Sequence, residues 1–235
     1  MKTAAALALT LFLSPAIADT LSVSLSNLTL DSASWSDIAG NLRASSSVPG
    51  QEPVSEIRPL DSLYGAHSLT VGGVTASKNA DGTSFLVTAD EAAPGTKYKG
   101  SIDLGTDFFG NRIMIAPFDT VTIYADFAGS ITKSEPCDSD ACGSGLFAYL
   151  KMYVNGPEIE FLLDNDGLFT LTSDSLARRL QLSYTNPTWE WLEATVDLEL
   201  GVHGMVAGPI PEPSTYALLA LGLGAIAVRS SRRSR

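Results

Sequence analysis

Three tryptophans and a surplus of carboxylates are the residues in this chain whose types best fit a ligand site. Trp35, Trp189 and Trp191 could line a sugar-binding cleft, because sugar rings stack on aromatic faces. Glu190 and Glu193 flank Trp191, and a glycosidase needs two carboxyl groups roughly 5–10 Å apart. The simpler interpretation, which the sequence favours, is that the tryptophans pack at a sheet edge, since large aromatic residues dominate cores. Trp189 and Trp191 are therefore the candidates for carbohydrate contact.

Nucleophilic catalysis has little support in the residue pattern. The two histidines, His67 and His203, are far apart in the sequence, and no Gly-x-Ser-x-Gly elbow occurs. A lone histidine is more often structural than catalytic. The sequence predicts no catalytic residue and a non-enzymatic protein, with a polysaccharide-acting hydrolase as an alternative.

Clustered oxygen ligands at residues 138–140 and 164–167 raise the question of a calcium site. Both segments are rich in Asp, with Ser, Asn or Gly between or after the carboxylates. Neither continues into the twelve-residue loop with a closing Glu, and turn formation alone explains these residue types. We therefore expect no metal and no cofactor, and keep calcium as the minor alternative.

Two cysteines, Cys137 and Cys142, are separated by four residues. A zinc site needs more ligands than the two histidines supply, and redox motifs normally have two residues between the cysteines. In an exported chain the oxidising environment favours a disulfide. The expected disulfide closes a short ring that pins the tip of a loop.

Alternating apolar and polar residues run through most of the chain and predict β-strands. The strongest segments are 121–128, 146–154 and 192–202, each with one apolar face. With many turn residues and almost no helical periodicity, the pattern predicts an all-β, antiparallel two-sheet sandwich that resembles a jelly roll.

Local patterns give further expectations for the connections between strands. We expect a hairpin between 121–128 and 146–154 around the cysteines, one strand over 68–77, a long loop over 45–59, a turn at 164–167 and a short helical turn over 173–178.

The charge of the chain is strongly asymmetric. Residues 19–208 hold 25 acidic and 10 basic residues, a net charge of −15, whereas the whole chain carries −11. Without a basic stripe to contact phosphates, nucleic-acid binding is disfavoured. The acidic balance favours solubility outside the cell.

The N-terminus has the pattern of a secretory signal peptide. Lys2 precedes a short apolar run over 3–13, and Ala16 and Ala18 form a small-x-small cleavage site. We expect signal peptidase to cut after Ala18, which makes Asp19 the first residue of the exported chain.

The C-terminus combines Pro211, Glu212 and Pro213 with an apolar run over 216–228 and a cluster of arginines over 229–235. Thirteen apolar residues are short for a membrane span. The arginines orient the tail toward the cytoplasm and the body outward. The two prolines force an extended segment that a protease can engage.

These residues resemble the PEP-CTERM sorting signal of Gram-negative bacteria: Pro-Glu-Pro, a Leu/Gly/Ala-rich helix and an arginine cluster, in a chain with an N-terminal signal peptide. The resemblance implies cleavage by exosortase, a membrane cysteine protease, and association with exopolysaccharide in a biofilm matrix. It implies transient membrane anchoring followed by placement at the cell surface or outside the cell.

The expected organisation therefore has five parts: a signal peptide at 1–18, a β-sandwich domain at 19–205, a linker with the Pro-Glu-Pro motif at 206–215, a transmembrane segment at 216–228 and a basic cytoplasmic tail at 229–235.

Overall fold

The computed structural model describes residues 19–31, 40–60, 65–91, 93, 95–105, 111–133, 143–155 and 159–206. The expected signal peptide, the sorting tail, Trp35 and the Cys137–Cys142 disulfide lie outside these ranges and remain predictions. Within the described ranges, no helix is long and apolar enough to cross a membrane.

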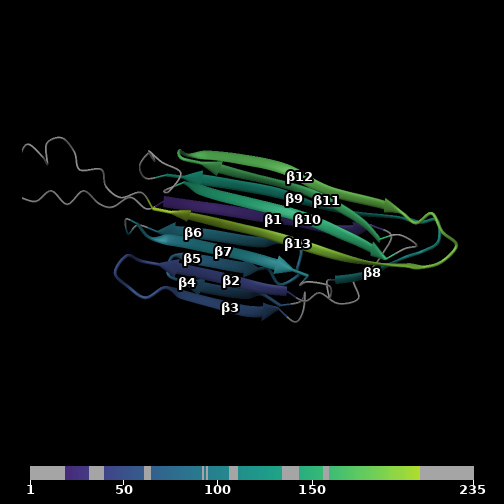
Figure 1. Cartoon of the computed structure of the whole chain (residues 1–235), viewed down its shortest axis with the longest axis horizontal. Helices are drawn as coiled ribbons and strands as arrows, with labels where there is room; N and C mark the ends of the chain where they lie inside the picture. The colour runs from purple at the N-terminus through teal and green to yellow at the C-terminus, as the bar shows by residue number, and fades with distance from the viewer. Residues whose placement is uncertain are drawn as a thin grey trace, which may run out of the picture.

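Thirteen β-strands form two antiparallel sheets that pack face to face (Figure 1). Sheet A has the order β12 (Asp174–Thr185), β9 (Thr120–Thr132), β1 (Asp19–Asp31), β6 (Phe85–Glu91), β5 (Val74–Lys78), β4 (His67–Val71). Sheet B has the order β11 (Ile159–Thr170), β10 (Ser144–Asn155), β13 (Leu192–Met205), β7 (Lys97–Leu104), β2 (Gly40–Ser47), β3 (Val54–Leu60), and β8 (Asn111–Ile115) also pairs with β13. The predicted all-β sandwich is confirmed.

Strand alternation places the core between the sheets, as the sequence pattern predicts. In β10 and β13 every second residue is an aliphatic or Met side chain facing inward, and most of the residues between them face outward. Phe85 and Phe127 are the largest fully buried side chains and lie on neighbouring parts of sheet A. Burial of each such side chain stabilises the fold by about 1.5–3 kcal/mol.

Most of the strands pair in the nested order of an eight-stranded jelly roll. In chain order, β10 pairs with the next strand, β11. The strand before them, β9, pairs with the strand after them, β12, and the earlier strands β7 and β8 both pair with the later strand β13. In a jelly roll the eighth position belongs to a strand that follows β13, but here β1 fills it, between β6 and β9. The first and last strands are therefore both central, one in each sheet.

Several expectations about the connections between strands are wrong. In each case the pairing with strands that are distant in the sequence, and not the local residue pattern, determines the structure. β9 and β10 do not form a hairpin: β9 pairs with β1 and β12, and β10 pairs with β11 and β13 in the other sheet. Residues 164–167 do not turn, because β11 stays paired with β10 through all of them. Residues 174–178 belong to β12 rather than to a helical turn.

Two further differences lie where the edge strands β3 and β4 of the two sheets face each other. Within the loop expected over 45–59, residues 45–47 end β2 and residues 54–59 belong to the edge strand β3, whose side chains are exposed up to Leu60 and therefore show no apolar alternation. The single strand expected over 68–77 is the hairpin β4–β5, which turns at Gly72 with φ of 57°. Glycine adopts this left-handed conformation without strain.

A buried ion pair joins the start of β1 to the residue that follows β9. Asp19 Oδ2 lies 2.8 Å from Lys133 Nζ, and the two side chains are 0% and 1% exposed. Lys133 Nζ also donates to the carbonyl of Met205 at the end of β13 (3.3 Å). The start of β1 and the end of β13 therefore lie together at one end of the sandwich.

Other buried polar groups surround this ion pair. Glu91 is opposite Asp19 in the β1–β6 register, and its Oε1 accepts hydrogen bonds from Ser46 Oγ (3.0 Å) and from the Gly73 amide (2.9 Å). The Tyr98 hydroxyl shares a hydrogen bond of 2.7 Å with Ser144 Oγ. Burial, above all, raises the pKa of Tyr98 to about 12, so this hydroxyl stays neutral below strongly alkaline pH.

Replacement of Lys133 by Met should lower the free energy of unfolding by about 3–5 kcal/mol, because it removes the cation that contacts the buried Asp19 carboxylate. Urea unfolding of the secreted protein measures this loss. Arg43 pairs with Asp103 at 3.7 Å but is 48% exposed, so Arg43→Met should cost about 1 kcal/mol or less. Equal losses in the two variants would contradict the role assigned to Lys133.

Candidate functional site

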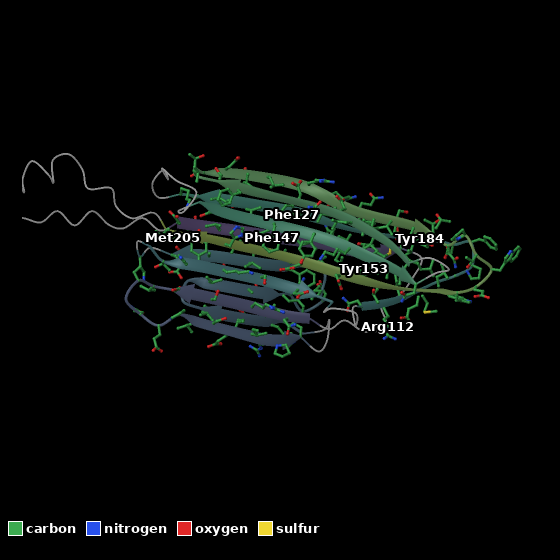
Figure 2. All side chains as sticks on the ribbon, in the orientation of Figure 1. Arg112, Phe127, Phe147, Tyr153, Tyr184 and Met205 are labelled. Atoms are coloured by element: carbon green, nitrogen blue, oxygen red, sulfur yellow. The ribbon has the colours of Figure 1, made fainter. Side chains whose placement is uncertain are left out.

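Two of the described chain connections lie at the end of the sandwich opposite the ion pair: residues 116–119 between β8 and β9 and residues 186–191 between β12 and β13. Figure 1 shows the β12–β13 connection at the far end of the molecule from the start of β1. In Figure 2, Met205 lies at one end, and Tyr184 and Arg112 lie toward the other.

Three aromatic side chains, which we call the aromatic tip, project from these connections: Phe118, Trp189 and Trp191. Their exposed fractions are 51%, 86% and 61%. The rings of Phe118 and Trp189 meet edge to face, with centroids 4.5 Å apart and planes at 86°. The expectation that Trp189 and Trp191 pack at a sheet edge is wrong, because both are largely exposed to solvent.

A buried asparagine fixes the conformation that exposes these rings. Asn186 is 0% exposed. Its Nδ2 lies within hydrogen-bond distance of the carbonyl oxygens of Ile115 (3.2 Å), Ala116 (3.1 Å) and Glu190 (2.7 Å), and its backbone amide donates to Asp119 O (2.9 Å). One side chain therefore ties the β12–β13 connection to the end of β8.

Thr188 completes the turn that carries the tryptophans. Its amide and its hydroxyl both donate to Asn186 Oδ1, at 2.9 and 2.8 Å, and its hydroxyl oxygen accepts from the Glu190 amide at 3.2 Å. Local bonds of this kind are typical of Asx and ST turns. The tip is held in one conformation before any ligand arrives, which reduces the entropy lost on binding.

Backbone strain occurs in the tip as well. Phe118 has φ of 59°, a left-handed conformation that is an outlier for a bulky residue. Such strain costs about 1–3 kcal/mol and is retained mainly at functional sites. Here the conformation places the Phe118 ring against Trp189.

The glutamates and histidines considered as catalytic residues do not lie together at the tip. Glu190 is exposed beside the tryptophans, and Glu193 pairs with Arg112 at 3.7 Å. His67 lies in β4 of sheet A, whereas His203 lies on the outer face of sheet B near the ion-pair end. The two histidines therefore share no site with each other or with the tryptophans.

Two of the carboxylates considered for calcium, Asp164 and Asp166, lie on the face of the edge strand β11 that is directed toward sheet A, whereas Asp138 and Asp140 lie outside the described residues. Arg178 NH2 lies 2.7 Å from Asp164 Oδ1, and Arg178 NH1 lies 3.6 Å from Asp166 Oδ2. Asp164 Oδ2 also accepts from the Gln181 amide at 2.8 Å. These two carboxylates therefore join the edge of sheet B to β12 of sheet A.

A hollow of about 330 Å³ on sheet A offers a different kind of surface. Four serines line it, Ser24, Ser26, Ser77 and Ser84, and Lys78 at its wall donates from Nζ to Gly65 O at 2.8 Å. Its one aromatic residue, Phe85, is buried in the core. The hollow lacks the exposed rings that distinguish the aromatic tip.

The fold defines this chain as an antiparallel β-sandwich protein of jelly-roll type with an exposed aromatic tip. No curated protein and no solved structure matches it. Residues 209–233 match the family described as PEP-CTERM protein-sorting motif. The end of the chain therefore carries a PEP-CTERM protein-sorting motif, which indicates export, sorting by exosortase and placement at the cell surface or outside the cell.

Phe118 and Asn186 belong to the site but were not singled out by the sequence. The Asn186-Pro187 pair signals only a break in the chain, and nothing in the local pattern shows that the asparagine reaches carbonyls about seventy residues earlier. The position of Phe118 after a proline likewise gives no sign that its ring meets Trp189.

Replacement of Asn186 by Asp should lower the free energy of unfolding by about 2–4 kcal/mol, because it sets a carboxylate against the three carbonyls that the amide now bonds. The near-ultraviolet circular dichroism of the tryptophans should weaken at the same time. Asn155→Asp, an exposed change at the end of β10, serves as the control. An unchanged tryptophan spectrum in Asn186→Asp would contradict the supporting role of Asn186.

Proposed function

We propose that this exported protein is a non-enzymatic component of the cell surface or extracellular matrix that binds exopolysaccharide through the aromatic tip. In this proposal residues 216–228 anchor the chain in the membrane until exosortase cleaves near Pro211, Glu212 and Pro213. The observation that carries the binding role is the exposure of Trp189 and Trp191 on a tip that a buried asparagine holds rigid.

Exposed aromatic rings of this kind need a reason, because a contiguous apolar patch on a soluble protein commonly marks a binding site. The C–H faces of pyranose rings pack on aromatic faces, while their hydroxyls need hydrogen-bonding neighbours. Glu190 and the Arg112–Glu193 pair supply such neighbours beside the rings. The residue types at the tip therefore fit a sugar better than a purely apolar ligand.

The position of the tip suits a tethered protein that reaches into a polymer. β13 begins next to the tip at Leu192 and ends at Met205, shortly before the sorting motif. Its fourteen residues span about 45 Å at roughly 3.3 Å per residue. While the C-terminus is anchored, the aromatic tip lies at the end of the domain away from the anchor.

The charge of the body supports the same choice of partner. A net charge of −15 over residues 19–208 repels the anionic surface of membranes. Insertion of the tip into a lipid surface is thus disfavoured relative to contact with a neutral polysaccharide. The acidic charge also keeps the delivered domain soluble.

Replacement of both tryptophans, Trp189→Ala with Trp191→Ala, should weaken binding to the glycans that the wild type binds on an array. Loss of an aromatic side chain that stacks on a ring ligand weakens binding by about 1–3 kcal/mol, roughly a factor of 5 to 150 for each ring. Ile57→Ala, which truncates an exposed apolar residue of β3, should leave binding unchanged.

Two results would contradict the proposal. One is a double variant that binds the same glycans as strongly as the wild type does. The other is a wild-type protein that binds no glycan but binds vesicles of phosphatidylethanolamine and phosphatidylglycerol. Thermal unfolding of each variant shows whether loss of binding reflects loss of the fold.

A further inference from the structure

A second group of rings, two of them exposed and two half-buried, lies on the outer face of sheet B, on three adjacent strands. We call it the aromatic shelf and define it by Phe147 and Tyr149 of β10, Phe169 of β11 and His203 of β13. The centroids of Phe147 and Tyr149 are 6.1 Å apart with planes at 18°, and those of Phe169 and His203 are 6.3 Å apart with planes at 21°. Phe147 and His203 join the two pairs at 6.3 Å.

Glycines on neighbouring strands let these rings lean across the sheet. Gly145 is opposite both Phe169 and His203, and Gly201 is opposite Phe147. A Cβ atom at Gly201 would lie 2.8 Å from Phe147 Cζ, and one at Gly145 would lie 2.6 Å from His203 Cε1 and 3.2 Å from Phe169 Cδ2. The rings therefore occupy space that side chains would otherwise fill.

Charged side chains border the shelf on the same face of the sheet. Lys151 Nζ lies 4.0 Å from the centre of the Tyr149 ring. Glu199 is opposite Tyr149 on one side and Asp103 on the other, and Lys99 is opposite His203. Burial and then the neighbouring Asp103 raise the pKa of Glu199, and burial and then Lys99 lower the pKa of His203.

The mixture of rings and charges restricts the kind of partner. A protein interface would have to bury Lys151, Glu199 and the Arg43–Asp103 pair, and charged residues are scarce at interface cores. An anionic lipid surface is disfavoured by the net charge of −15 over residues 19–208. A neutral polysaccharide meets neither obstacle, because its hydroxyls hydrogen-bond to both signs of charge while its C–H faces stack on the rings.

We propose that the aromatic shelf is a second polysaccharide-binding surface, which takes a neutral polymer chain lying across β11, β10 and β13. The proposal rests on the polymer class proposed for the aromatic tip but on different residues. The shelf lies on a sheet face toward the ion-pair end, and the tip lies at the opposite end. One molecule then contacts two polymer strands and cross-links them, with the gain in avidity that two linked sites give.

The experiment separates the two sites by spectroscopy, because two of the three tryptophans, Trp189 and Trp191, belong to the aromatic tip. The processed protein is purified from the culture medium and titrated with cellohexaose, laminarihexaose and soluble dextran. Isothermal calorimetry reports binding at either site, and the part of the change in tryptophan fluorescence that is lost in the tip-deficient variant reports binding at the tip. Titrations are repeated with Trp189→Ala/Trp191→Ala, which removes the tip.

The tip-deficient protein should still bind at least one of these sugars. In that background Phe147→Ala and Phe169→Ala should each weaken binding at least about tenfold, as expected for loss of a stacked ring. Tyr124→Ala, an aromatic change on sheet A, should leave binding within about twofold. If Phe147→Ala fails to fold, Tyr149→Ser tests the shelf instead, because it leaves the Phe147 ring in place over Gly201.

Each outcome decides between the two sites. The shelf proposal is overturned if the tip-deficient protein binds no sugar. It is also overturned if the tip-deficient protein binds sugar and the shelf substitutions do not weaken that binding. If calorimetry shows binding that the shelf variants remove while tryptophan fluorescence never changes, the shelf stands and the tip proposal fails. Absence of binding by the wild-type protein overturns both.

Discussion

The buried contact between Lys133, Asp19 and the carbonyl of Met205 is the constraint on which the arrangement of this protein depends. It holds the first strand of one sheet and the last strand of the other at the same end of the sandwich. Because β1 fills a position that a later strand takes in a jelly roll, the core closes only when the two ends of the domain meet. The opposite end is thereby left without termini, and two short connections can be shaped there into the aromatic tip.

The two aromatic surfaces follow from different features of the same strands. At the tip, Asn186 satisfies backbone carbonyls from two connections, so Phe118, Trp189 and Trp191 need not pack inward to keep the turn intact. On the outer face of sheet B, glycines on β10 and β13 leave room for rings that lean across the sheet. In both places the protein presents rigid aromatic area beside charged groups, which is the combination that sugars bind.

Strict alternation allowed the sequence to predict the all-β class and the faces of β10 and β13, because every second residue there is buried. The same signal is absent from β3, whose exposed side chains need no apolar partner, and is misleading at residues 164–167, where Asp and Gly occur inside a paired strand. Which sheet β10 joins, and what Asn186 contacts, depend on residues far away in the chain. The exposure of Trp189 and Trp191 was unpredictable for the same reason.

Retention in the polymer around the cells that secrete this protein tests the account most directly. The amount of the protein in the polysaccharide-rich matrix is compared with its amount in the free medium. The comparison is made for the wild type and for one variant that carries all four substitutions, Trp189→Ala, Trp191→Ala, Phe147→Ala and Phe169→Ala. The account predicts that the wild type stays with the matrix and that the variant, folded and processed at its C-terminus, moves to the medium. A folded variant that remains in the matrix to the same extent as the wild type would contradict it.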